Sequence, residues 1–326
     1  MCGLDLLRDH ALLRGAAKCR MLSGGVAVEP TVEPRGLNGA QERRHMKKDI
    51  TRGPGASSLV LQPEERAEFL ECIYRSCNKK QRLCRDPLAV VLRYEASADR
   101  EVAGLICSML AFGNVDLIVR ACEAALEPLG AHPADSLCAL RDPDVRRLWG
   151  NFQYRFCFSD DIIGFLLAIR RARIEYGSLE NLFLAGDDGS GTVAAPAANF
   201  VRALHAYAPF RKNLLPSPGA GSACKRLFLF LRWMVRRDEV DPGDWTHVSP
   251  ARLIVPLDVH MVRTCQDRLG FIPRGTGGAP APTLRMALAV TAQFAEYSAG
   301  DPVKYDFALT RPGIDPRPGD DVFHCS

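Results

Sequence analysis

Apolar and polar positions recur with the period of an α-helix along most of the chain from Pro63 onward. Pro63 and the acidic residues behind it mark the start of the first predicted helix. Asn114 is the predicted N-cap of a later helix, which Gly130 ends. The strand-like run RLIVPL contains Pro256, and proline argues against a central β-strand. The helical segments are, in chain order, PEERAEFLECIYRSCNKK, DREVAGLICSMLAFGN, NVDLIVRACEAALEPLG, SDDIIGFLLAIRRARIEYG, TVAAPAANFVRALHAYA and SACKRLFLFLRWMVRRDE. We therefore predict an all-α fold.

The first 60 residues differ from the rest of the chain, because they are rich in Gly, Pro and Arg and lack a long hydrophobic period. We predict that residues 1–60 form a disordered tail and that residues 61–326 form a helical domain. A hydrophobic content of 47% in 326 residues is enough for a large core. No apolar run reaches the roughly 18 residues of a membrane-spanning helix, and the N-terminus lacks the apolar stretch of a secretory signal. We expect a monomer that resides in the cytoplasm and does not bind membranes.

Twelve cysteines are spread along the chain without a single CxxC pair. Structural zinc sites and iron–sulfur clusters use closely spaced cysteines, so we expect neither. A disulfide framework is not expected in a long chain without a secretory signal. We interpret most of the cysteines as small buried hydrophobic residues, and we expect no cofactor.

Positive charge is concentrated in one stretch, although the net charge of the whole chain is only +4. Residues 201–237 contain no Asp or Glu. The basic residues of this stretch are Arg202, Arg211, Lys212, Lys225, Arg226, Arg232, Arg236 and Arg237. Such a stretch suits phosphate binding, or it is a helix face whose counter-charges come from elsewhere in the fold. The sequence leaves both interpretations open.

Within this stretch, LLPSPGAGSACKRL predicts a tight turn that leads directly into a helix. Gly219 and Gly221 permit the backbone conformations of the turn and leave its amides uncovered, which is the arrangement of an anion site. We predict the following helix from about Ser222 to Arg237. Lys225, Arg232 and Arg236 would share one face of that helix, and Leu227, Leu231 and Met234 would form the core face.

Asp258 lies in the apolar run LIVPLDVHM, where an aspartate is costly unless a partner or a task compensates. It is the predicted N-cap of a helix that Gly270 ends, and backbone N–H bonds would keep it ionised. It is either a cap alone or a catalytic carboxylate beside a sugar, where it would stabilise an oxocarbenium-like transition state. Asp258 and His260 could supply two metal ligands, but no second cluster lies nearby, so we expect no metal site.

At these two segments the chain resembles the helix-hairpin-helix DNA glycosylase superfamily. VPLDVHM is similar to the segment that carries the essential aspartate of that superfamily, and PSPGAGSA is similar to its hairpin turn. From about residue 63 to 315 the chain also resembles a bacterial family of uncharacterised proteins, a domain of unknown function. The segments that carry this second resemblance are DPLAVVLRY, EVAGLICSMLAFGNV, FQYRF, GSACKRLFLFLRWMVRRDEVDPGDW and DPVKYDFAL. The first resemblance implies a two-lobed all-α fold with a pocket between the lobes.

The resemblance assigns roles to individual residues of this sequence. Asp258 takes the catalytic position, and Phe112 takes the place of the wedge residue that fills the gap left by a flipped base, unless it is ordinary core. Ala223 occupies the position of the lysine nucleophile of bifunctional members, so Lys225 is either a displaced nucleophile or a phosphate contact. The residues expected to contact DNA are Gly219, Gly221, Ser222, Arg226, Arg232 and Arg236, together with Phe112.

Two further segments supply pocket candidates besides His260. In FQYRF, Tyr154 and Arg155 would stack a base and clamp a phosphate, or they are buried aromatic and ion-paired core residues. In DPVKYDFAL, Tyr305 and Asp306 mark a helix start, and the resemblance places that helix near the pocket.

The function that the resemblance implies is that of a DNA glycosylase in base excision repair, acting on damaged bases or abasic sites. Asp258 would stabilise the oxocarbenium transition state and position water. The alternatives are a non-catalytic binder of damaged DNA and an RNA- or nucleotide-directed enzyme that uses the same pocket. A metal-dependent hydrolase built on Asp258 and His260 is a more distant alternative. The sequence leaves the lesion, and enzymatic activity itself, open.

Overall fold

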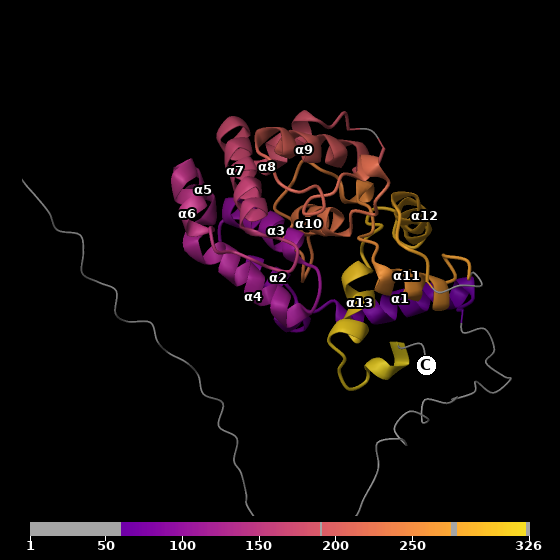
Figure 1. The fold of residues 1–326 in the computed structure, drawn as a ribbon. Coiled ribbons are helices and arrows are strands. Elements are labelled where there is room, and N and C mark those ends of the chain that lie inside the picture. The colour runs from indigo at the N-terminus through magenta and orange to yellow at the C-terminus, as the bar shows by residue number, and fades with distance from the viewer. Residues whose placement is uncertain (1–59, 190, 275–278, 324–326) are drawn as a thin grey trace, which may run out of the picture. The chain divides into compact units, whose positions relative to one another are not determined.

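The computed structural model describes residues 60–189, 191–274 and 279–323, and this part of the chain is helical (Figure 1). Within it, the chain forms no β-strand and only isolated bridges between single residue pairs. The predicted all-α class is therefore confirmed. The α-helices are α1 (Pro63–Cys77), α2 (Leu88–Val91), α3 (Ser97–Leu110), α4 (Val115–Leu126), α5 (Pro133–Ala139), α6 (Asp142–Leu148), α7 (Ser159–Tyr176), α8 (Leu179–Ala185), α9 (Ala194–Tyr207), α10 (Lys225–Val235), α11 (Val259–Asp267), α12 (Leu284–Ala295) and α13 (Asp306–Ile314). The 3₁₀ turns are η2 (Lys80–Arg85), η3 (Glu127–Leu129), η4 (Pro218–Ala220), η5 (Pro250–Arg252) and η6 (Asp320–Phe323).

The predicted starts and ends of helices agree well with the structure where a local signal marks them. Helix α1 begins at Pro63 with two acidic residues in its first turn. The Asn114 side chain accepts hydrogen bonds from two backbone amides at the start of α4. After α4 and η3 the chain turns at Gly130, whose φ of 65° suits glycine. Residues 1–59 of the predicted tail lie outside the described residues, so the tail stays a prediction.

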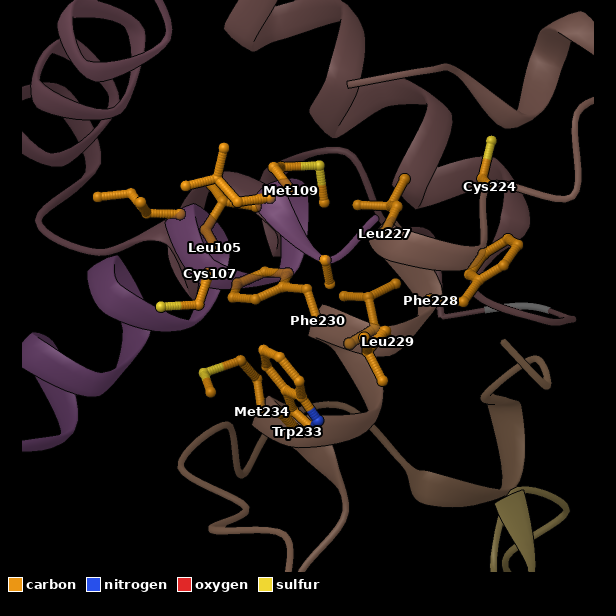
Figure 2. Packing of buried hydrophobic residues seen from close by; sticks show 14 of the residues in the cluster. Leu105, Cys107, Met109, Cys224, Leu227, Phe228, Leu229, Phe230, Trp233 and Met234 are labelled. Atoms are coloured by element: carbon orange, nitrogen blue, oxygen red, sulfur yellow. The ribbon is translucent and has the colours of Figure 1, made fainter. Parts of the chain in front are cut away.

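Helix α10 lies at the centre of the core and packs against α3 (Figure 2). The predicted core residues Leu227, Leu231 and Met234 are fully buried. The burial goes further than a single face, because every residue of α10 from Leu227 to Val235 is buried. Large side chains such as Phe230 each contribute about 1.5–3 kcal/mol when buried in this way. From Leu227 to Val235 the helix therefore has no solvent-facing side, so a basic residue in this part, such as Arg232, lies inside the protein.

A second group of helices consists of α1, α11 and α13, in which α13 packs against both of the others (Figure 1). Tyr305 and Phe307 at the start of α13 are buried among them. The turn η6 is tied back to η2 by Arg82, which donates two hydrogen bonds to the Asp320 carboxylate at 2.7 and 2.6 Å. None of the described helices combines the length and the apolar character that crossing a membrane requires.

Candidate active site

A cavity of about 550 Å³ lies where α10, the start of α11, α13 and the turn after α3 meet. Its walls come from segments far apart in the chain, from Arg85 to Ile314, which are 229 positions apart. The cavity brings together many of the predicted site residues. These are Phe112, Lys225, Arg226, Arg232, Asp258, His260 and Asp306. The other candidates, namely Tyr154, Arg155, Gly219, Gly221, Ser222, Arg236 and Tyr305, do not line it.

Asp258 is the N-cap of α11, as predicted. Its Oδ1 accepts hydrogen bonds from the backbone amides of His260 and Met261, both at 2.9 Å. Its Oδ2 lies 3.7 Å from Nζ of Lys225, and the side chain is 25% exposed. One oxygen thus fixes the carboxylate on the helix, while the other faces a cation at the cavity wall.

Lys225 is the first residue of α10. The predicted start at Ser222 is wrong by three residues, because Gly221 and Cys224 both adopt the left-handed conformation and the α-helix begins only after Cys224. Lys225 is 33% exposed at the side chain, whereas Ala223 is buried. The left-handed turn therefore brings Lys225 to the carboxylate of Asp258.

Asp306 is a second carboxylate of the cavity, and it is 5% exposed. Burial raises its pKa, and the charge of Arg232, which donates a hydrogen bond to it, acts in the opposite direction. The negative charge of Asp258 raises the pKa of Asp306 further, and the positive charge of Lys225 lowers it. Two carboxylates and two cations are therefore close enough to influence one another's ionisation.

The predicted basic face of α10 is corrected by the structure. Arg232 and Arg236 are each 3% exposed. Arg232 is paired with Asp241 and Asp306, and Arg236 is paired with Asp241, Asp238 and Asp301. A buried guanidinium that is held by carboxylates cannot reach the phosphates of a duplex. Arg232 and Arg236 therefore fit the second interpretation of the basic stretch, in which the counter-charges come from elsewhere in the fold.

The predicted turn forms as η4, and Gly221 has a φ of 78°. Its amides are used within the turn: those of Ala220 and Gly221 donate to the carbonyls of Ser217 and Pro218, and that of Gly219 donates to the Ser217 hydroxyl. The expected set of free amides for an anion is therefore absent from these three residues. The residues from Gly219 to Ser222 are nevertheless exposed.

Phe112 lines the cavity and is half-buried in a stack of side chains. The Phe156 ring is parallel to it at 4.2 Å between centroids, and the Arg226 guanidinium lies 5.0 Å from its centroid. Arg226 also donates hydrogen bonds to the carbonyls of Met109 and Asn213, and burial lowers its pKa to about 10. The Phe112 ring is thus in contact with at least two of the protein's own side chains.

The remaining candidates lie in other places. Tyr154 is buried and donates a hydrogen bond to the Phe112 carbonyl at 2.5 Å, while Arg155 is exposed with a φ of 51°. Both line a separate cavity of about 490 Å³. Tyr305 is 1% exposed and donates to the Glu71 carboxylate at 2.6 Å, so it contributes to packing near the cavity but not to its wall. His260 is exposed at the edge shared with a neighbouring cavity of about 340 Å³.

The structure adds residues that the sequence did not single out, namely Asp86, Thr310 and Arg311 at the cavity wall. Asp86 and Arg311 form an ion pair of 3.0 Å although they are 225 positions apart in the chain. No local pattern marks such a pair. Asp86 resembles an ordinary helix-start aspartate, since its Oδ1 accepts a bond from the Leu88 amide.

Among the described residues, no group of His, Cys, Asp or Glu side chains is arranged to hold a metal ion. The cysteines of this part are free thiols, and most of them are buried. Burial raises the pKa of the Cys224 thiol beside Lys225 to about 11, which makes it a poor nucleophile.

Comparison with known proteins gave two findings. A family model described as "Protein of unknown function (DUF2400)" matches residues 86–315. The crystal structure of the 8-oxoguanine DNA glycosylase of Thermotoga maritima is similar, with a TM-score of 0.40 and 15% sequence identity over 78% of this chain and 98% of that chain. No curated protein gave a significant sequence match.

Proposed function

The chain belongs to the family described as protein of unknown function (DUF2400), and we propose that it is a DNA glycosylase-like enzyme of base excision repair. The substrate would be a damaged base or an abasic site in DNA. We also propose that the cavity lies between two lobes, one built from the central helices and the other from α1 and the C-terminal helices. The volume of about 550 Å³ is in the usual range of small-molecule sites, about 300–1,000 Å³.

The observation that carries this proposal is the geometry of Asp258. Two backbone amides hold Oδ1, and Oδ2 remains available at the wall of the cavity. A carboxylate fixed in this way keeps its orientation without further reorganisation. Such pre-organised charge is what the departure of a nucleobase from C1′ requires, because positive charge develops on the sugar.

In the proposed reaction Asp258 stabilises the positive charge at C1′ and accepts a proton from an attacking water. The new C1′–O bond forms as the C1′–N bond breaks, and the electron pair of that bond leaves with the base. Lys225 lies on the same wall and holds Oδ2 in position. Its ammonium group and the exposed turn from Gly219 to Ser222 would contact the DNA backbone on either side of the flipped nucleotide.

The 3.7 Å separation between Lys225 Nζ and Asp258 Oδ2 favours a second candidate, an abasic-site lyase. A neutral Lys225 amine would attack C1′ of the open-chain sugar in place of water. Loss of water then gives a Schiff base, and elimination of the 3′ phosphate follows. For this reaction the proton of Lys225 must first pass to solvent or to Asp258.

An incision assay tests the proposal directly. Wild-type protein, Asp258→Asn and Lys225→Ala would each be incubated with duplexes that carry uracil, hypoxanthine, 8-oxoguanine, an alkylated adenine or an abasic site. After treatment with hot alkali, which cleaves abasic sites, we expect wild type to have removed the base from at least one duplex and Asp258→Asn to be slower by about 10²- to 10³-fold. Asparagine still caps a helix, so the variant should fold and bind DNA nearly as well as wild type.

Borohydride distinguishes the two candidates. A trapped covalent complex that is lost in Lys225→Ala, with strand cleavage before alkali, would establish the lyase. Base release that is seen only after alkali, without trapping, would establish hydrolysis by water. Equal rates for wild type and Asp258→Asn would exclude the catalytic role of the carboxylate. Tight binding to abasic DNA without any cleavage would instead favour the non-catalytic binder of damaged DNA.

A further inference from the structure

The wall of the cavity includes the guanidinium of Arg311, which the proposed chemistry does not use. Arg311, on α13, lines the cavity and its side chain is only 4% exposed, compared with 33% for Lys225. Its guanidinium lies 4.3 Å from the centroid of the Phe307 ring. Arg311 is therefore packed against the Phe307 ring at a poorly exposed part of the cavity wall.

The hydrogen bonding of Arg311 is incomplete. Nη2 makes one long contact of 3.4 Å with the Thr310 hydroxyl. Nη1 lies 3.0 Å from the Asp86 carboxylate, but its N–H groups do not point at that oxygen, and Nε has no acceptor within reach. A guanidinium carries five N–H donors, and leaving buried donors unsatisfied costs about 1–3 kcal/mol each. Nε and Nη1 have almost no exposed surface, so the donor that remains for a ligand is Nη2, whose contact with Thr310 uses one of its two N–H groups.

The acidic residues around the cavity are already engaged. Asp86 is paired with Arg311, Asp306 with Arg232, and Asp258 with Lys225. Asp86 also accepts the Leu88 amide. Nη2 of Arg311 therefore offers a spare donor at the wall that the structure describes, whereas each of these carboxylates already faces a cation.

We propose that Arg311 is a specificity-determining residue that donates a hydrogen bond to an acceptor atom on the edge of the bound nucleobase. Bases that carry an exocyclic carbonyl would then be preferred to bases that carry an amino group at the same position. This inference rests on the proposed function, because it assumes that a base enters the cavity beside Asp258.

A base fits Arg311 better than a phosphate does. A phosphate at Arg311 would face the carboxylates of Asp86 and Asp306, which line the same cavity. A neutral base avoids this repulsion.

The test compares two bases that differ in one group, hypoxanthine and adenine. Each would be placed opposite a tetrahydrofuran abasic analogue, in a non-hydrolysable 2′-fluoroarabino nucleotide. Binding would be measured by fluorescence anisotropy, with a duplex that carries only the tetrahydrofuran analogue as the baseline. For wild type we expect the hypoxanthine duplex to bind about 10-fold more tightly than the adenine duplex, the effect of one hydrogen bond to a charged donor. In Arg311→Met the ratio should fall to about 1, with the baseline duplex unaffected.

Matched variants separate recognition from folding. Arg311→Met leaves Asp86 unpaired, so the double variant Asp86→Asn/Arg311→Gln provides a neutral pair of similar size and should also lose the preference. Arg100→Met removes another poorly exposed arginine, which donates to Asp244 at 2.7 and 2.6 Å away from the cavity. It should keep the preference despite a similar loss of stability.

The outcomes distinguish a failure of the inference about Arg311 from a failure of the proposed function. Loss of the ratio in the Arg311 variants alone supports the inference. A wild-type ratio of about 1, or an equal loss of affinity for all three duplexes in Arg311→Met, overturns it and leaves the proposed function standing. If wild type binds the tetrahydrofuran duplex no better than an intact duplex, the proposed function and this inference both fail.

Discussion

The two ends of α10 carry the same kind of residue in different physical surroundings. At the C-terminal end Arg232 and Arg236 are buried, and the carboxylates around them compensate their charge. At the N-terminal end Lys225 is one-third exposed and has one carboxylate, that of Asp258, at 3.7 Å. The two buried and fully paired arginines stabilise the fold. The partly exposed and loosely paired Lys225 remains available for a ligand. The difference teaches that the charge pattern of a helix predicts function only after its counter-charges are known.

The largest effect should follow from breaking the buried end. Arg236→Met would leave Asp238, Asp241 and Asp301 without their shared cation, and removing one partner of a buried ion pair costs about 3–5 kcal/mol. We expect a loss of this size in the free energy of unfolding, measured by urea denaturation, with unchanged DNA affinity per folded molecule. A variant as stable as wild type but weak in DNA binding would mean that Arg236 does contact phosphate.

A smaller effect should appear in acid. Burial disfavours ionisation of Asp238, but the charge of Arg236 and the amides of Asp241 and Val240 outweigh it and hold the pKa of Asp238 at about 2. This pKa is depressed below that of the unfolded chain, so the group stabilises the fold above about pH 4. The contribution, about 2 kcal/mol, is lost as the pH falls from about 4 to about 2.

Asp238→Asn tests this contribution. The difference in unfolding free energy between wild type and variant should be largest near pH 7 and about 2 kcal/mol smaller at pH 2. Urea denaturation at both pH values measures it. A difference that does not change with pH would show that Asp238 acts through its neutral hydrogen bonds alone.

The smallest effect on stability should follow from Lys225→Ala, because a cation at a helix N-terminus is not favoured by the helix dipole. We expect a change in unfolding free energy of less than about 1 kcal/mol. If Lys225 contacts a phosphate, the slope of log affinity against log salt should decrease by about 1. Lys79→Ala is the control, since Lys79 is 44% exposed and does not line the cavity. An unchanged slope would remove Lys225 from the DNA interface.

The sequence predicted those features that depend on neighbouring residues. The helical period gave the all-α class, and the caps at Asn114 and Asp258 followed from the residue types at helix starts. The turn at Gly219 and Gly221 was predicted for the same reason. In each case the partners lie within four positions, so the pattern contains the whole interaction.

The rest depends on partners that are distant in the chain. The pairs of Arg232 with Asp306 and of Arg311 with Asp86 join residues 74 or more positions apart, and no local pattern indicates them. The start of α10 was misplaced because Cys224 adopts a left-handed conformation that residues other than glycine rarely adopt. Tertiary contacts decide both kinds of feature.

The two carbonyl bonds of Arg226 have a mechanical consequence for the mouth of the cavity. One guanidinium joins the end of α3 at Met109, the segment before the turn at Asn213 and the ring of Phe112. A force on any of these three segments is transmitted to the other two through a single side chain. A displacement of any one of the three therefore strains the contacts of Arg226 with the other two.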